Sequence, residues 1–122
     1  MPASCAARRR LATNRGESTM HFLVSAKIRK PRSVSNKDFY GVWQRESVAG
    51  REIEKTGAPI YKVAGEYEVV FIAEVEKPAD LDAALHGLPI WKEGYQDMVE
   101  VTVKALVPYG EWGEKLDELV AG

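Results

Sequence analysis

One carboxylate occurs at a position where a helix would turn toward its core. From Phe39 to Ile53 the apolar residues recur on one side of a helix, because each helical residue advances by ~100°. These residues are Phe39, Val42, Trp43, Ala49, Gly50 and Ile53. Glu46 falls near the middle of this apolar stripe. A carboxylate facing an apolar layer is costly unless it is paired, hydrated or protonated.

Such a carboxylate is suited to proton transfer. Burial raises the pKa of a carboxyl group toward neutral pH, where it can act as both base and acid. Glu46 is therefore the candidate catalytic residue. The structural alternative is that Glu46 reaches the edge of the stripe, or pairs with a buried Arg or Tyr, without a chemical role.

The alternation of apolar and polar residues predicts four strands around this helix. They cover residues 20–28, 60–64, 66–76 and 97–107. The helix begins after Ser35 or Asn36 and ends near Lys55, before Gly57 and Pro59. A second helix is expected from Lys77-Pro78 to Gly87, a loop or short helix over 90–96, and a short terminal helix over 111–120.

The resulting order of elements predicts an α+β fold. Strand, helix, strand, strand, helix, strand is the ferredoxin-like βαββαβ plan, a four-stranded antiparallel sheet with both helices on one face. The other face combines apolar with charged side chains. It would present Leu23, Val70, Ile72, Met98 and Leu106 among Ser25, Lys27, Glu68, Glu100, Thr102 and Lys104. We expect this face to bind a second copy of the chain, and the terminal helix with Trp112 to pack on a neighbour.

Composition restricts the partners. The chain has 122 residues, 45% hydrophobic and 29% charged, which fits one soluble globular domain. The net charge of -1 gives no electrostatic basis for binding nucleic acid or an anionic membrane, so we expect neither partner. The lone Cys5 excludes an internal disulfide framework, and neither His21 nor His86 has a partner at metal-ligand spacing, so no metal is expected. No apolar run reaches the ~20 residues of a membrane span, and a cytoplasmic location is expected.

Residues 1–19 differ from the rest of the chain. They contain four arginines and no apolar periodicity, and they lack the apolar segment of a secretory signal. We predict a disordered or extra arm, or an upstream start ahead of Met20, with a transit peptide as the alternative. The domain is expected over residues 20–122.

Several short motifs resemble the muconolactone delta-isomerases of aromatic catabolism. They are Glu46 in the first helix, the turn from Lys62 to Tyr67 (KVAGEY), and Leu88-Pro89 ahead of the last strand. The resemblance covers roughly residues 20–107. It implies a dimeric α+β barrel, often assembled into larger rings, with a site between the sheet and the helices of each protomer. It also implies a cofactor-independent isomerase that moves a proton within an unsaturated lactone.

The same resemblance assigns site residues. Glu46 stands at the family's helix carboxylate position and Tyr67 at a tyrosine that lines the pocket, so both are expected to be catalytic. The expected substrate-binding residues are Phe22, Trp43, Val69, Phe71 and Trp91. The chain departs from the family at Glu66, where the family has a histidine, and at Val69 and Phe71, where it has polar residues.

These departures predict a more apolar pocket and a larger substrate, such as a polyketide-like or aromatic intermediate. A substrate carboxylate would need a cationic partner, for which Lys62 and Lys92 are candidates. Two other functions stay open. One is a cofactor-free oxygenase or cyclase acting on aromatic polyketides, with Trp43, Tyr67, Phe71 and Trp91 holding a flat ring. The other is a non-catalytic binding module.

Overall fold

The computed structural model of the protein describes residues 19–122. Its four strands form one antiparallel sheet in the order β2-β3-β1-β4. The strands are β1 (Met20–Ile28), β2 (Ile60–Lys62), β3 (Glu68–Val75) and β4 (Val99–Leu106). The helices are α1 (Asn36–Lys55), α2 (Pro78–His86), α3 (Pro89–Lys92) and α4 (Tyr109–Ala121), with the 3₁₀ turn η2 at Gln96–Met98.

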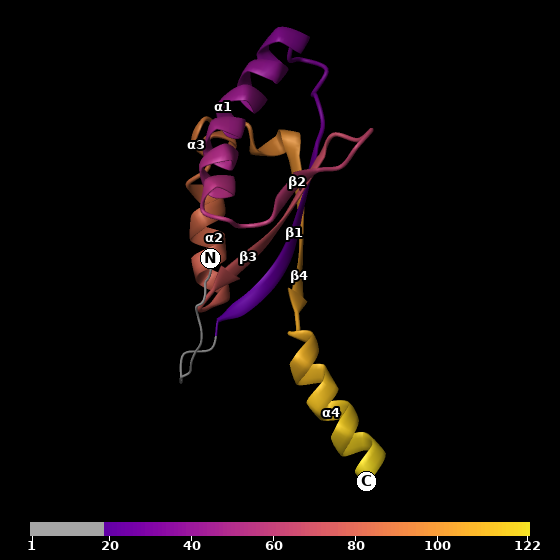
Figure 1. The fold of residues 1–122 in the computed structure, drawn as a ribbon. Coiled ribbons are helices and arrows are strands. Elements are labelled where there is room, and N and C mark those ends of the chain that lie inside the picture. The colour runs from indigo at the N-terminus through magenta and orange to yellow at the C-terminus, as the bar shows by residue number, and fades with distance from the viewer. Residues whose placement is uncertain (1–18) are drawn as a thin grey trace.

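The helices α1, α2 and α3 lie along one side of the sheet, whereas α4 extends away from the end of β4 (Figure 1). The order of elements and the antiparallel pairing confirm the predicted ferredoxin-like plan. Among residues 19–122, no helix has the length and apolar content needed to cross a bilayer.

Local signals determine the limits of α1. The Ser35 hydroxyl accepts a hydrogen bond from the Asp38 N–H at 3.1 Å, so Ser35 caps the helix and Asp38 adds a negative charge at its positive end. At the other end Gly57 has a φ of 90°, a left-handed conformation that glycine adopts without strain. The helix buries Phe39 and Val42 against the sheet.

The core lies between the helices and the sheet and has two parts. One part joins β1, α1, α3 and η2 through Ile28, Phe39, Val42, Ile90 and Met98. The other joins the start of β1 to α2 through Phe22, Val24 and Leu81. The alternation along β1 is thus confirmed, with Phe22, Val24 and Ile28 on the helix side.

Strand ends differ from the sequence prediction. β2, β3 and β4 are each shorter than predicted, because turns take up the ends of these apolar runs. Met98 was predicted on the open face, and this is wrong. It lies in η2, where its N–H donates to the Tyr95 carbonyl at 2.9 Å, and its side chain is 1% exposed in the core. A 3₁₀ turn breaks the two-residue alternation on which that prediction depended.

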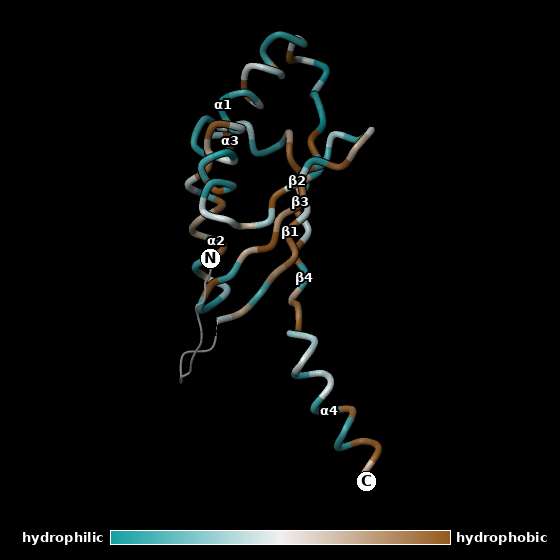
Figure 2. Tube along the Cα trace, viewed as in Figure 1, coloured by the Kyte–Doolittle hydropathy of each residue, from teal (hydrophilic) through white to brown (hydrophobic). Residues whose placement is uncertain are grey.

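The terminal helix α4 buries none of its residues. Hydrophobic and hydrophilic residues follow one another along it (Figure 2), and its large apolar side chains Trp112, Leu116, Leu119 and Val120 are exposed. The predicted arm over residues 1–19 lies outside the described residues apart from Thr19, whose hydroxyl donates to Glu74 at 2.9 Å.

Candidate functional site

A cavity of about 360 Å³ lies between α1, the sheet and the α2–α3 segment. β1, β3 and β4 form its floor, α1 forms one wall, and Leu85, Leu88 and α3 form another. The lining is mainly apolar. It includes Val24, Ala26, Ile28, Val69, Phe71, Ile90, Val99 and Val101. Such a cavity, with few polar groups, is typical of a small-molecule site.

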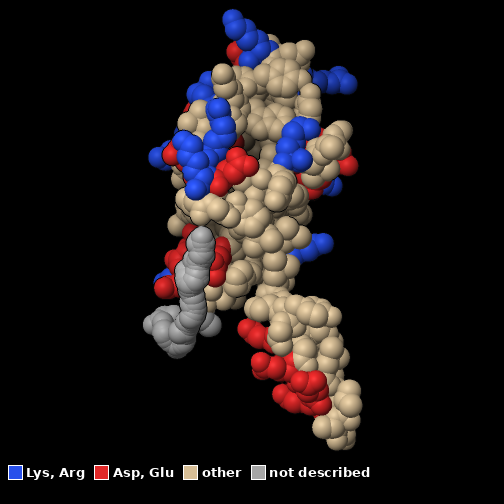
Figure 3. Space-filling view, in the orientation of Figure 1, with Lys and Arg blue, Asp and Glu red and all other residues tan. Residues whose placement is uncertain are grey.

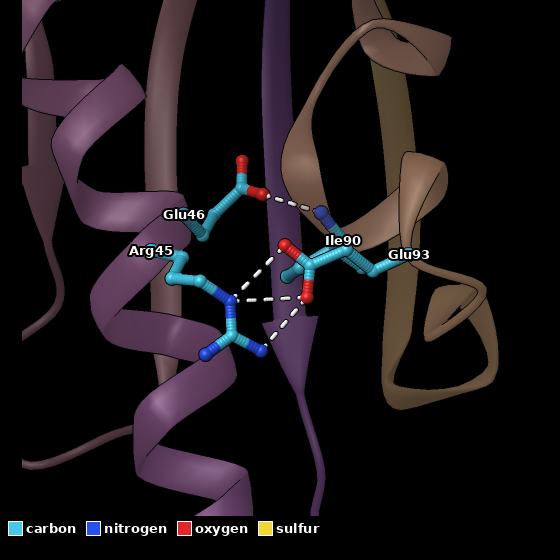
Figure 4. Close-up of polar contacts among 4 residues, drawn as sticks. All are labelled: Arg45, Glu46, Ile90 and Glu93. Carbon is cyan, nitrogen blue, oxygen red and sulfur yellow. Dashed lines mark hydrogen bonds and ion pairs between the residues drawn. The ribbon is translucent and has the colours of Figure 1, made fainter.

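Glu46 extends from α1 into this cavity and is half-buried. Its Oε1 accepts a hydrogen bond from the Ile90 N–H at 2.9 Å (Figure 4). This N–H is in the first turn of α3, directly after Pro89, and so has no carbonyl partner within the helix. Within residues 19–122 the second oxygen, Oε2, has no hydrogen-bond partner. The partner of Glu46 is therefore a backbone amide, neither an Arg nor a Tyr, and one oxygen can still contact a bound molecule.

The pKa of Glu46 is raised above its ordinary value. Burial against the apolar walls is the largest cause, because it disfavours the charged form. The hydrogen bond from Ile90 opposes the rise, and the nearby negative charge of Glu93 adds to it. A carboxylic acid with a raised pKa can exchange protons near neutral pH.

The preceding residue, Arg45, forms an ion pair with Glu93, the residue that directly follows α3. Its Nε lies 3.0 and 3.1 Å from the two oxygens of Glu93, and its Nη2 lies 2.7 Å from Oε1 (Figure 4). The hydrogen bonds from Arg45 lower the pKa of Glu93. Arg45 and Glu46 together attach α1 to α3 and the residue that follows it.

Tyr67 is next to the cavity and does not line it. Its ring lies 5.2 Å from that of Trp43, which does line the cavity, and stacks on Phe39 at 6.0 Å. Its hydroxyl is hydrogen-bonded to the Tyr40 hydroxyl at 2.6 Å, and this contact raises the pKa of Tyr40. Tyr67, the predicted catalytic tyrosine, thus packs against Trp43, and Trp43 is the residue that lines the cavity.

Four of the five expected substrate-binding residues line the same cavity as Glu46. They are Trp43, Val69, Phe71 and Trp91. Phe22 does not line it. Phe22 lies at the start of β1, opposite Ala73 and Ala105, and packs in the core below α2 with Leu81. Its position on the helix side was correctly expected, but the cavity begins further along β1, at Val24.

Charged residues occur at the cavity rim. Arg51 and Glu54 of α1 and Lys62 of β2 are exposed and line it. On this face of the molecule, basic side chains gather over α1 and near β2, with acidic side chains between them (Figure 3). Lys62 was a candidate from the sequence. Lys92, the other candidate, does not line the cavity.

Sequence reasoning missed Arg51 and the amide of Ile90. The helical spacing puts Arg51 on the polar side of α1, and the residue is exposed, yet it also lines the cavity. A Cβ at the preceding Gly50 would lie 3.7 Å from Ile60 Cδ1, an ordinary contact distance, so α1 lies close to β2 at this point. Pro89 was the signal for the amide, because proline favours the first helical position and the N–H groups of a first helical turn have no carbonyl partner within the helix.

The described residues give no basis for a metal centre. Within residues 19–122, no three side chains of His, Cys, Asp or Glu converge to hold an ion. The charged groups that line the cavity are instead one half-buried carboxylate and three charges at its rim, together with the uncharged polar residues Ser47 and Tyr61.

The family model for muconolactone delta-isomerase matches residues 20–111. No curated protein matches the chain significantly. The matched range starts at β1, includes the whole sheet and every residue that lines the cavity, and ends in the first turn of α4. It covers well over half of the chain, which therefore belongs to the muconolactone delta-isomerase family.

Proposed function

We propose that the chain is a cofactor-independent isomerase that shifts a proton, and with it a double bond, in an unsaturated lactone or a related carbonyl compound. Glu46 removes a proton next to the carbonyl and returns it to another carbon. The observation that carries the proposal is the position of Glu46, which faces an apolar cavity with one oxygen bound to the Ile90 N–H and the other without a protein partner in the described chain. Family membership supports the reaction class.

The remaining site residues position the substrate. Trp43, Phe71 and Trp91 provide flat apolar surfaces beside Glu46, and aromatic walls favour a planar unsaturated molecule. Tyr67 acts through its packing on Trp43.

The surroundings of the cavity favour a substrate larger than a simple lactone. A second hollow of about 630 Å³ lies along β3 and α2, and it shares Ile53, Phe71, Leu85 and Leu88 with the first. Rotation of one of these side chains would lengthen the apolar space. A polyketide-like or polycyclic substrate would occupy this longer apolar space.

The chain also acts as a homodimer or a larger homo-oligomer in this proposal. Leu23, Val70 and Ile72 lie on the sheet face that no helix of residues 19–122 covers. Further exposed apolar side chains continue from β4 onto α4, namely Leu106, Val107, Trp112, Leu116 and Leu119. Burial of such a surface against a second copy is favourable.

The test follows proton transfer directly. The full chain is incubated with muconolactone in deuterated water, and both product and deuterium incorporation are measured. Turnover should fall by about 100-fold or more in Glu46→Gln, which keeps the shape and removes the base. Glu52→Gln is the matched control, because Glu52 lies on the exposed side of the same helix, bound to Lys55.

Exchange without product would mean that the base is correct and the substrate is a different carbonyl compound. Undiminished exchange in Glu46→Gln would rule out Glu46 as the base.

The aromatic walls favour one second candidate, a cofactor-free oxygenase or cyclase acting on aromatic polyketides. Trp43, Phe71 and Trp91 line one cavity and could hold a polycyclic quinol. Oxygen consumption with such a quinol, with no deuterium exchange on lactones, would favour the oxygenase. A lack of both deuterium exchange and oxygen consumption with the tested substrates would favour the alternative of a non-catalytic binding module.

A further inference from the structure

We propose that the hollow along β3 and α2 is a second binding subsite, which holds an apolar tail of the substrate while the unsaturated head lies beside Glu46. Phe71 divides the two spaces and is the specificity-determining residue. The inference rests on the proposed function of the first cavity. It adds the chemical class of the substrate, which is an unsaturated carbonyl compound with a long apolar tail.

The covered face of β3 continues from the first cavity into the second hollow. Every second residue of a strand points to the same face. Val69 lines the first cavity, Phe71 lines both spaces, and Ala73 and Val75 line the second hollow. From Val69 to Val75 the strand spans ~20 Å, at ~3.3 Å per residue. The two spaces are thus consecutive parts of one path along the strand.

Phe71 is the largest side chain on this path. It pairs with Val24 of β1 on one side and with Ile60 of β2 on the other, and both of these residues line the first cavity. The next residue of β3 on the covered face is Ala73, which lines only the second hollow. Its small side chain leaves space above the strand directly beyond Phe71. The Phe71 side chain therefore lies at the boundary between the two spaces.

The helices add three residues to this boundary. Ile53 of α1, Leu85 of α2 and Leu88, directly before α3, line both spaces and are half-buried, as Phe71 is. A core residue such as Phe39 is only 1% exposed, and close packing holds it in one rotamer. Side chains that adjoin an open space have room to change rotamer. The boundary can therefore open without disturbing the core.

The second hollow offers mainly apolar surface to a ligand. α2 packs against β3 (Figure 1) and contributes Leu81, Ala84 and Leu85 to the lining. The polar side chains of the lining have partners within the chain. The Thr56 hydroxyl donates to the Ile53 carbonyl at 2.6 Å, and a Glu74 oxygen lies 3.3 Å from His21 Nε2. An apolar tail gains most from such a site, because its burial removes hydrocarbon from water.

The test compares two saturated lactones with the same ring and different tails. Binding of γ-valerolactone, with a methyl tail, and of γ-decalactone, with a hexyl tail, to the full chain is measured by titration calorimetry. We expect γ-decalactone to bind about 30-fold more tightly or better, because five further carbons leave water. Phe71→Ala should raise this ratio of affinities by about three- to tenfold. Phe71→Leu, which keeps a smaller apolar side chain, should raise it less.

A matched pair on α2 separates the subsite from general hydrophobicity. Ala84 lines the second hollow, whereas its neighbour Ala83 is exposed and does not. Ala84→Trp should fill the hollow and weaken γ-decalactone binding by about tenfold, with γ-valerolactone binding changed less than twofold. Ala83→Trp should change neither affinity.

Equal affinities of the two lactones, binding of neither, or equal effects of the two tryptophan variants would each overturn the proposal. An unchanged ratio in both Phe71 variants would overturn the role of Phe71. Deuterium exchange that depends on Glu46, without a preference for the longer lactone, would contradict the tail subsite alone. A preference for the longer lactone without such exchange would contradict only the role of Glu46.

Discussion

The two faces of the sheet have the same alternating pattern and opposite surroundings. On the face that α1, α2 and α3 cover, β1 presents Val24, which is 0% exposed, and the half-buried Glu46 of α1 has a raised pKa. On the open face the acidic residues have polar partners on the neighbouring strand, Glu68 with Ser25 and Glu74 with His21. Both faces contain apolar residues, but among residues 19–122 it is the covered face that contains a cavity with a half-buried acid.

The difference shows how the same residue type acquires different roles. A glutamate beside solvent with a polar partner contributes little to stability. A glutamate between a helix and an apolar sheet face becomes a weaker acid that can exchange a proton. The helices that cover one face therefore create the surroundings that raise the pKa of Glu46, and the uncovered face is the surface through which we propose association.

The largest effect should come from adding a charge to the covered face. Val24→Asp buries a carboxylate without a partner, and we expect the free energy of unfolding to fall by at least about 4 kcal/mol. The neighbouring Leu23→Asp, on the open face, should cost about 1 kcal/mol or less when the protein is dilute enough to be monomeric. Urea denaturation of both variants measures the difference. Equal losses would mean that the two faces are equally buried in solution.

The second prediction concerns association through the open face. Leu23→Asp and Ile72→Asp place a negative charge in the proposed interface and should raise the dimer dissociation constant by about 100-fold or more. Light scattering over a range of protein concentrations measures the constant. Ser33→Asp, outside that face, is the control. An unchanged oligomer in both variants would require another interface, of which α4 is the candidate.

A smaller effect on the free energy of unfolding is expected from the titration of Glu46 on the covered face. Because the folded pKa of Glu46 lies above its ordinary value of 4.5, the native state keeps the proton to a higher pH than the unfolded chain. The contribution of Glu46 to stability is thus greatest below pH 4.5 and declines as the pH rises through the raised pKa. Glu46→Gln should remove this decline and be the more stable protein at neutral pH. Unfolding free energies from pH 4 to 8 test this, and identical profiles would contradict the raised pKa.

The smallest effect should come from the exposed pair that holds α3 over the covered face. Arg45 and Glu93 have side chains 53% and 34% exposed, so solvent screens their interaction. A double-mutant cycle with Arg45→Gln and Glu93→Gln should give only a small coupling energy, well below the loss expected for Val24→Asp. A much larger value would mean that charge pairing, more than apolar packing, keeps the cavity closed on that side.

Sequence periodicity was sufficient for the order of the elements and for the side of the sheet that the residues of β1 face. The stripe from Phe39 to Ile53, the alternation along β1 and the cap at Ser35 are local patterns, and local physics determines them. The same reasoning failed at Met98. This residue lies in the 3₁₀ turn η2 and is buried in the core, and the alternation of the sequence before β4 does not indicate that turn.

The sequence alone determined the ferredoxin-like order, the family and the orientation of Glu46 toward the core. Only the tertiary structure decided which amide binds Glu46, that Phe22 packs away from the cavity and that Arg51 lies at its rim. These facts depend on how closely α1 approaches β2 and α3. No local pattern specifies that approach, because it results from packing between residues far apart in the chain.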